Sequence, residues 1–253
     1  MHILVTNDDG VQAPGLLALA QEMRKLGKVT VLAPDRNWSA SGHVKTMERP
    51  LRVRETRLAD DTPAFMSDGA PSDCVALALL GLVKEVDLVV SGINPNANIG
   101  HDVTYSGTVT AAMEAVITDV YGIAISLDTP ENHGELLDYS TAAIVGRRVA
   151  EKVLTDGLPE GVLLNVNVPY LLESELNGYM ITRQGLRVYR DELDKRVDPR
   201  GKPYYWIGGE APTGVDEPGT DFGALRAGYV SITPLQLDLT AREALDTLKD
   251  WSF

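Results

Sequence analysis

Cysteine, aromatic residues and long apolar runs are all scarce in this chain of 253 residues. The one cysteine, Cys74, cannot form a disulfide within the chain, and no charged segment followed by an apolar run and a cleavage site is present. We therefore expect a cytoplasmic protein. The longest nearly apolar run, Cys74–Val83, is far shorter than the roughly 20 residues that cross a bilayer, so we expect no membrane segment.

Acidic residues outnumber basic residues in the chain. The chain has 23 Lys and Arg against 36 Asp and Glu, which gives a formal net charge of −13. Such a charge repels the phosphates of DNA and RNA, so we expect no binding of nucleic-acid polymers. Hydrophobic residues nevertheless make up 44% of the chain, which is enough for a full core and excludes a disordered protein.

Segments of strand and helix character alternate along most of the chain. A short apolar run ends at an Asn-Asp-Asp-Gly turn, helical periodicity follows behind Pro14, and a second apolar run comes next. This order predicts a strand–helix–strand unit, and its continuation predicts an α/β fold with a Rossmann-like, doubly wound, mostly parallel sheet. The expected strands are His2–Thr6, Val29–Ala33, Asp87–Ser91, Gly122–Ser126, Val162–Val168 and Tyr229–Thr233, and the expected helices are Leu16–Leu26, Val75–Leu82 (buried), Val109–Ile117, Val145–Val153 and Ala241–Leu248.

The residue composition changes in the last third of the chain. The segment Arg183–Gly219 is rich in glycine, proline, tyrosine and charge, and Tyr204-Tyr205-Trp206 lies near its middle. We expect an irregular β-hairpin arm at about 183–219 and a C-terminal helix at about 241–253. The core would then comprise about 1–180 and 220–240, all within a single domain of residues 1–253.

Polar residues follow three of the expected strands, at the edge where open α/β sheets bind ligands. Asp8 and Asp9 follow the first strand, and their mutual repulsion requires a cation or a proton unless they form a solvated turn. After the second strand, Ser39 either offers an oxygen to a cation or caps local backbone amides. His43 in the same loop is a proton donor, a phosphate contact or a plain loop residue.

The loop after Ser91 has the highest density of amide side chains. Asparagines occupy positions 94, 96 and 98, and Asn94 can aim its amide oxygen at the crevice of the two aspartates. The loop leads to Ser106-Gly107-Thr108 at the start of a helix, where unpaired N–H groups bind phosphate and an N-cap is also expected.

These oxygen atoms together favour a hard divalent cation. Two carboxylates, an amide oxygen and a hydroxyl, from Asp8, Asp9, Asn94 and Ser39, suit one Mg²⁺ or Mn²⁺ ion. The histidines and the cysteine show no zinc spacing, and the motifs of P-loop enzymes, dinucleotide dehydrogenases and serine hydrolases are missing.

Many segments of the chain, in order and over nearly its whole length, resemble the SurE family of survival-protein nucleotidases. They are Thr6–Gly10, Ala33–Asp35, Ser39–Gly42, Asp73–Val75, Ser91–Asn94, Tyr105–Val109, Leu164–Pro169, Thr182–Gly185, Gly219–Asp221 and Gly228–Leu235. One position departs from the family pattern S-G-I-N-x-G-x-N-x-G, because Asn96 replaces a glycine. We expect Asn96 to preserve the turn by adopting a positive φ.

The resemblance implies a metal-dependent phosphatase that acts on nucleoside 5′- and 3′-monophosphates and on short polyphosphate. It implies one metal ion bound by the four oxygen donors named above, and homodimers or homotetramers built through the arm. Asp8 or Asp9 is the expected catalytic carboxylate, either as proton acceptor or by direct attack. The expected substrate-binding residues are Asn98, Ser106, Gly107, Thr108 and His43, the last also a candidate proton donor to the leaving group.

Two other functions fit the same residues. A nucleoside hydrolase also uses aspartates and a divalent cation, but it cleaves the glycosidic bond. A nucleotide-binding sensor would hold its ligand in the same crevice without turnover.

Overall fold

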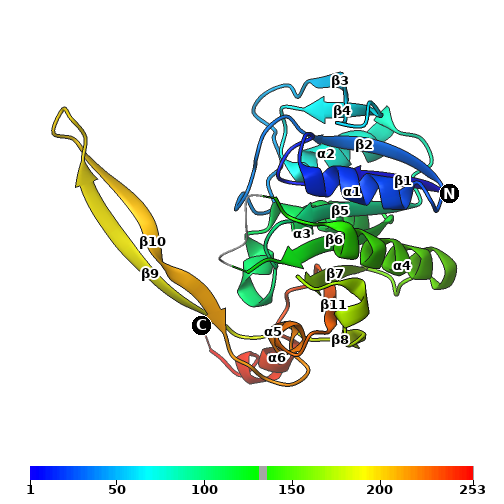
Figure 1. Ribbon diagram of the computed structural model, residues 1–253. Helices are drawn as coiled ribbons and strands as arrows, with labels where there is room; N and C mark the ends of the chain where they lie inside the picture. The colour runs from blue at the N-terminus through cyan, green and yellow to red at the C-terminus, as the bar shows by residue number, and fades with distance from the viewer. Residues whose placement is uncertain (131–135, 253) are drawn as a thin grey trace.

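The strands of the central sheet pair mostly in parallel. The computed structural model describes residues 1–130 and 136–252, and its main sheet has nine strands in the order β3-β4-β2-β1-β5-β6-β7-β11-β8 (Figure 1). Only β3 against β4 and β11 against β7 pair antiparallel within it. The strands are β1 (His2–Thr6), β2 (Lys28–Pro34), β3 (Val53–Arg57), β4 (Pro63–Ser67), β5 (Leu88–Asn94), β6 (Tyr121–Asp128), β7 (Val162–Pro169), β8 (Tyr179–Ile181) and β11 (Val230–Gln236).

Helices cover both faces of the sheet, as a doubly wound fold requires. Side chains of α1 (Pro14–Met23) and α4 (Ser140–Asp156) form one core with Ile3 and Val5 of β1. Side chains of α2 (Pro71–Leu77) and α3 (Gly107–Ile117) form a second core with Leu4, which points to the opposite face. The shorter helical elements are η1 (Ala78–Leu82), η2 (Gly100–Thr104), η3 (Glu173–Glu175), α5 (Asp221–Arg226) and α6 (Arg242–Leu248).

The chain reverses its direction across the sheet at β1. From β1 it moves to β2 on one side, and it later returns to β5 on the other side. The loops that follow β1, β2 and β5 therefore meet at one carboxyl edge, at the kind of switch point where open α/β sheets bind ligands.

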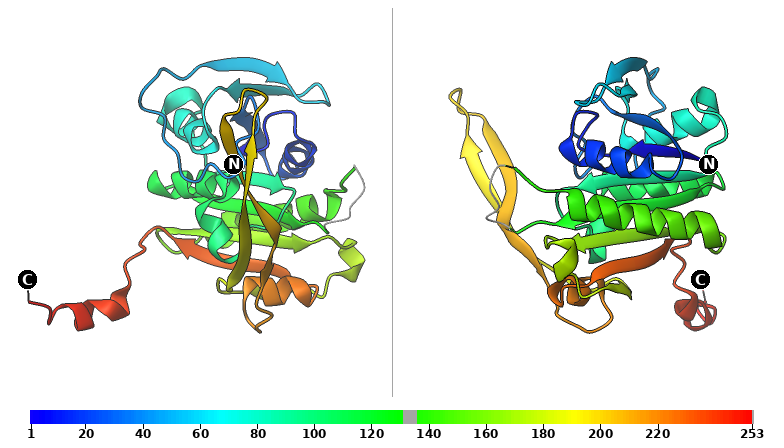
Figure 2. Two further views of the ribbon diagram at one scale, coloured as in Figure 1. Left: turned by 90° about the vertical axis from the view of Figure 1, so that its left-hand side faces the viewer. Right: turned by 45° about the vertical axis from the view of Figure 1, so that its right-hand side comes forward.

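A long hairpin leaves the body of the molecule. Among the strands of the described residues, β9 (Arg187–Val197) and β10 (Pro203–Gly214) pair only with each other. The views show them rising away from the main sheet (Figures 1 and 2). The hairpin lies where the sequence predicts an arm, but its ladder is regular except for one shift between Glu210 and Thr213. The segment with α6 also extends away from the body (Figure 2).

Several elements differ from the sequence expectation. Helix α1 ends at Met23, and residues 24–26 form a turn. The helix expected at Val75–Leu82 begins at Pro71 and passes into the π-helical η1, where Leu80 is 78% exposed, so its second half is not buried. The helix α4 is longer than the valine spacing indicated, because its polar outer face carries no periodic signal.

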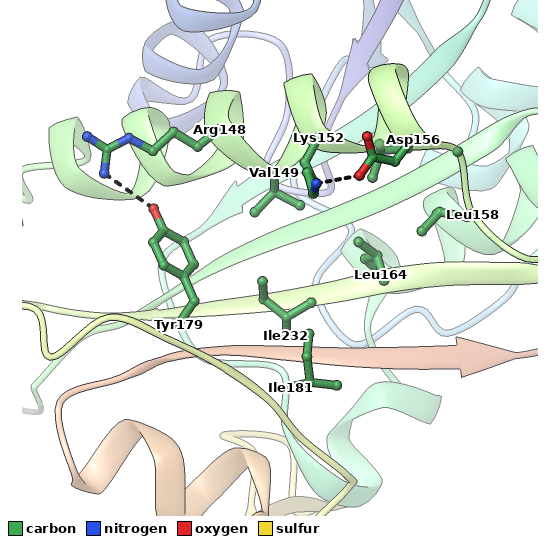
Figure 3. A pocket seen from close by; sticks show the side chains of 11 residues that line it. Arg148, Val149, Lys152, Asp156, Leu158, Leu164, Tyr179, Ile181 and Ile232 are labelled. Atoms are coloured by element: carbon green, nitrogen blue, oxygen red, sulfur yellow. Dashed lines mark hydrogen bonds and ion pairs between the residues drawn. The ribbon is translucent and has the colours of Figure 1, made fainter.

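A hollow of about 490 Å³ lies between α4 and the edge strand β8 (Figure 3). Its apolar side chains include Val149, Leu164 and Ile232, and two polar pairs, Arg148 with Tyr179 and Lys152 with Asp156, lie along its rim. Its α4 residues come from the second half of that helix and Leu164 lies near the start of β7, so the hollow lies away from the carboxyl edge of the parallel strands. Among the described residues, no helix is long and apolar enough to cross a membrane.

Candidate functional site

The first aspartate is held against the N-terminus of α3. Asp8 is 3% exposed, and its Oδ1 accepts a hydrogen bond of 2.6 Å from the hydroxyl of Thr108. Burial raises the pKa of Asp8, while Thr108 and the backbone N–H groups of Gly107 and Thr108 oppose that rise. Glycine is required at position 107, because a Cβ there would lie 2.8 Å from the Cβ of Asp8. The helix terminus and the carboxylate therefore form one packed unit.

The second aspartate is less constrained. Asn37 donates to Asp9 Oδ1 over 3.3 Å. Burial, and then the charge of Asp8, raise the pKa of Asp9 to about 7. Burial, and then the charge of the Asp9 carboxylate, raise the pKa of the half-buried Tyr139 to about 12. The phenol of Tyr139 therefore remains a neutral donor. Tyr139 is the N-cap residue of α4, and no sequence motif marks it.

The turn after β1 brings the next loop over the aspartates. Asn7 closes the turn through hydrogen bonds to both backbone groups of Gly10. The backbone N–H of Trp38 then donates to the carbonyl oxygen of Asp8 over 2.7 Å. Ser39 follows directly and is exposed, with its backbone N–H bonded to Asn37 Oδ1 at 2.7 Å. The structure thus brings the Ser39 loop to the carboxylate pair.

Asn94 ends the neighbouring strand β5. Its amide nitrogen donates to the carbonyl oxygen of Asn96 over 2.5 Å, which leaves the amide oxygen for another partner. The positive φ expected at Asn96 is wrong, because Asn96 is not among the non-glycine residues of the described chain that have one. Those residues are Ala40, Asp61, Glu85 and Asp119. The turn needs no left-handed residue at position 96, which explains why asparagine is accommodated there.

Asn98 ties the loop after β5 to the neighbouring strands β6 and β7. Its side chain donates to Ser126 Oγ of β6 over 2.8 Å, and its carbonyl oxygen accepts from Asn165 and Asn167 of β7 at 2.7 and 3.1 Å. Ser106 is the N-cap of α3, since its Oγ accepts from the backbone N–H of Val109 over 3.1 Å. Both residues support the loop and the helix start with their side chains.

His43 lies along α3, beyond its first turn. Its Nε2 is 3.0 Å from Glu114 Oε2, and Lys45 Nζ is 2.9 Å from Glu114 Oε1. Burial opposes ionisation of Glu114, but the hydrogen bonds from His43 and Lys45 prevail and lower its pKa. The pair fastens the Ser39 loop to the helix, and Thr110 Oγ1 adds a bond of 3.1 Å to the carbonyl oxygen of Gly42.

Two further aspartates connect the arm to the loop before α3. Asp102 in η2 accepts from Arg187 Nε over 2.7 Å and from the Tyr189 hydroxyl over 2.6 Å. The buried Asp221 accepts from the backbone N–H groups of Gly100 and Gly185 over 2.8 and 2.7 Å. Sequence reasoning missed both, because each joins segments more than 30 residues apart and only the Gly219–Asp221 segment drew notice.

The donor set suits a hard divalent cation. The adjacent carboxylates of the buried Asp8 and the partly buried Asp9 repel one another. The amide oxygen of Asn94 and the hydroxyl of Ser39 are neutral hard donors. Within the described residues, no group of three or more His, Cys, Asp and Glu side chains is placed to hold a metal. A site at this edge would therefore combine the two carboxylates with neutral oxygens.

Comparison with known proteins gives a consistent result. A family model described as "Survival protein SurE" matches residues 3–191. The chain is 55% identical to the 5′-nucleotidase SurE of Herpetosiphon aurantiacus, over 95% of this chain and 94% of that protein. It is 50% identical to the 5′-nucleotidase SurE of Chloroflexus aggregans, over the whole of both chains. The crystal structure of the SurE protein from Aquifex aeolicus superimposes with a TM-score of 0.82 at 42% identity, over 98% of each chain.

Proposed function

The chain belongs to the survival protein SurE family and is a nucleotidase, and we propose that its catalytic site is the strand-end cluster around Asp8 and Asp9. The reaction is hydrolysis of nucleoside 5′- and 3′-monophosphates to nucleoside and phosphate, with short polyphosphate as a further substrate. The observation that supports this site best is the carboxylate pair packed against the N-terminus of α3 at the switch point of the sheet.

Asp8, Asp9, Asn94 and Ser39 would hold one divalent cation, Mg²⁺ or Mn²⁺. When bound, such a cation supplies Lewis-acid activation and neutralises phosphoryl charge. The N-terminus of α3 and the side chains near it bind the remaining phosphate oxygens, and its dipole steadies the charge of the transition state. Asp8 is fixed by Thr108, so we assign proton acceptance from the attacking water to the less constrained Asp9.

The test is release of inorganic phosphate from 5′- and 3′-nucleoside monophosphates after chelator treatment, with Mg²⁺ or Mn²⁺ returned. Asp8→Asn should abolish release, while the exposed Asp119→Asn should match the parent protein. Metal-dependent release that survives in Asp8→Asn would contradict the proposed site. Free base without phosphate would indicate a nucleoside hydrolase, and binding without any product would indicate a sensor.

We also propose that the hairpin of β9 and β10 joins copies of the chain into a homodimer or homotetramer. Its exposed apolar residues support this, because such surfaces usually mark protein interfaces. They include Leu193, Val197, Tyr205, Trp206 and Ile207. The cytoplasm is the proposed compartment, since the one cysteine, Cys74, is buried and has no partner for a disulfide within the chain.

A further inference from the structure

One face of α3 lies against both the turn after β1 and the loop after β2. Gly107, Thr110 and Glu114 follow one another at helical spacing, so they line up along this face over two turns. Gly107 packs on Asp8, since a Cβ at position 107 would lie 2.8 Å from the Cβ of Asp8. Thr110 Oγ1 lies 3.1 Å from the carbonyl oxygen of Gly42, and Glu114 bonds to side chains further along the same loop. One rigid helix therefore contacts two segments that carry proposed metal ligands.

Ser39 lies in a short turn whose two ends are anchored. The backbone N–H of Ser41 donates to the carbonyl oxygen of Trp38 over 3.2 Å and closes this turn. At the first end, the N–H of Trp38 donates to the carbonyl oxygen of Asp8. At the second end, the N–H of Gly42 donates over 2.9 Å to a carbonyl oxygen of the segment that leads into α3. The position of Ser39 therefore depends on how the residues at and after Gly42 are held.

Glu114 holds the residues that follow Gly42. It is 2% exposed, and its two carboxylate oxygens bond to different side chains, Oε2 to His43 at 3.0 Å and Oε1 to Lys45 at 2.9 Å. Both partners are partly exposed, so water can solvate them when Glu114 is replaced. The desolvation of a buried carboxylate offsets much of the attraction to its partners, so such a pair contributes more to the geometry of the loop than to net stability.

We propose that Glu114 is a positioning residue for the divalent cation, because its bonds to the loop set where Ser39 lies relative to Asp8. The proposal rests on the proposed function, since it concerns the ligands of that site. Thr108 orients Asp8 from the first turn of α3, and Glu114 holds the Ser39 loop about two turns later. Without Glu114 the loop keeps its backbone anchors, but Ser39 samples more positions. Ordering Ser39 around the ion then costs entropy, which weakens metal binding.

Calorimetric titration with Mn²⁺ in the absence of substrate tests the proposal. Glu114→Leu removes both acceptor oxygens, and the dissociation constant for Mn²⁺ should rise by about 10- to 100-fold, the range for residues that orient metal ligands. Glu114→Gln keeps one acceptor oxygen and should give a smaller rise. A merely structural role would reduce the fraction of folded protein. It would therefore lower the number of Mn²⁺ ions bound per chain and leave the dissociation constant of the remaining sites unchanged.

Glu22→Leu is the matched control. The carboxylate of Glu22 also bonds to two cationic side chains, Lys25 and Arg147, but it joins α1 to α4 on the face of the sheet opposite α3. Its replacement should leave the dissociation constant for Mn²⁺ unchanged. An equal rise in Glu22→Leu would reveal a general effect of lost stability and would overturn the proposal. An unchanged dissociation constant in Glu114→Leu would overturn it as well.

Phosphate release at increasing Mn²⁺ concentration separates this role from the proposed function. In Glu114→Leu the half-saturating Mn²⁺ concentration should rise, while kcat and the KM for a nucleoside monophosphate should approach the parent values at saturating Mn²⁺. A kcat that stays low there would contradict a role in metal positioning.

Calorimetry and phosphate release together distinguish the remaining outcomes. If the parent protein binds Mn²⁺ but releases no phosphate, the proposed function fails, and the dissociation constants still decide the role of Glu114. If phosphate is released and the dissociation constant does not depend on Glu114, the positioning role alone fails. A parent protein that binds no Mn²⁺ would overturn both.

Discussion

At the residue scale, the side chain of Thr108 orients the carboxylate of Asp8. Its hydroxyl donates to Asp8 Oδ1 over 2.6 Å, and both side chains are buried. Thr108→Val keeps the shape but removes the donor, so the pKa of Asp8 should rise further and the carboxylate should lose its fixed orientation. We expect the affinity for Mn²⁺ or the activity to fall by about 10- to 100-fold, the loss typical when a residue that orients a metal ligand is replaced.

Titration with Mn²⁺ followed by phosphate release measures this effect. Thr155→Val is the control, because the Thr155 hydroxyl donates to the carbonyl oxygen of Glu151 within α4 over 2.8 Å, far from the aspartates in the chain. If Thr108→Val retained the metal affinity and the activity of the parent protein, Thr108 would have no role in orienting Asp8.

Asp9 makes the stability of the metal-free protein depend on pH. Burial and the charge of Asp8 raise its pKa from 3.8 to about 7. The folded protein then binds more protons than the unfolded chain in this window, so stability falls as pH rises through it. The loss should be at most on the order of 4 kcal/mol and should be smaller when a divalent cation is added.

Urea unfolding with chelator at pH 5 and pH 7.5 tests this dependence. Asp9→Asn removes the titrating group and should flatten the difference between the two pH values, whereas the exposed Asp119→Asn should keep it. An equal pH difference in the parent protein and in Asp9→Asn would show that Asp9 is not the group responsible.

Residue types and strand ends were sufficient to find the aspartates. Asp8 and Asp9 follow a clear apolar strand, and the crossover rule places the loops after β1, β2 and β5 together. The bond from Thr108 to Asp8 was not predictable, because 100 residues separate the two and only the packed helix shows which hydroxyl faces which carboxylate. The same applies to Tyr139, whose proximity to Asp9 has no signature in the sequence.

At the scale of elements, the loop after β2 is tied to α3 by Glu114. This carboxylate is buried and bonds to both His43 and Lys45 of the loop. Glu114→Gln removes the negative charge, so Lys45 would face a neutral amide. We expect a loss of about 1–3 kcal/mol in unfolding free energy, less than for a fully buried pair because Lys45 is half exposed and can reach water.

Urea unfolding of Glu114→Gln checks this loss, and Glu151→Gln is its control. Glu151 is exposed and its contact with Arg147 is 3.8 Å, so its replacement should cost less than about 0.5 kcal/mol. Equal stability of the two variants would mean that the buried pairs do not hold the loop.

The elements that sequence reasoning missed are those with weak apolar patterns. The edge strand β3 reads Val-Arg-Glu-Thr-Arg and is mostly exposed, so its pairing with β4 had no hydrophobic signal. The strand β8 has three residues, and α5 has six, which is too short for a periodicity to show. The buried strands and the amphipathic helices, by contrast, carry periods that residue patterns alone could show.

At the scale of the whole molecule, the arm has no core of its own. It is a two-stranded sheet, and an isolated hairpin of this kind is only marginally stable in water. Its exposed apolar side chains include Trp206 at 61% and Ile207 at 83%. Contact with another copy of the chain would both bury these side chains and stabilise the strands, which is the physical argument for assembly through the arm.

Replacing Trp206 by Ser together with Ile207 by Asp should therefore shift the protein to a smaller species. The double variant removes the two large apolar side chains and adds a negative charge, whose burial in an interface costs free energy. Sedimentation or light scattering measures the mass, and Leu80→Ser with Leu82→Ser is the matched control, since these leucines are 78% and 57% exposed on η1, outside the arm.

The control should form an assembly of the same mass as the parent protein, while the assembly formed by the arm variant should have at most half of that mass. An unchanged mass in the arm variant would place the interface elsewhere. Because the base of β9 is bonded to Asp102 in the segment before α3, loosening the arm should also raise the KM for nucleoside monophosphates. A loss of mass with this KM unchanged would show that assembly and the site are independent.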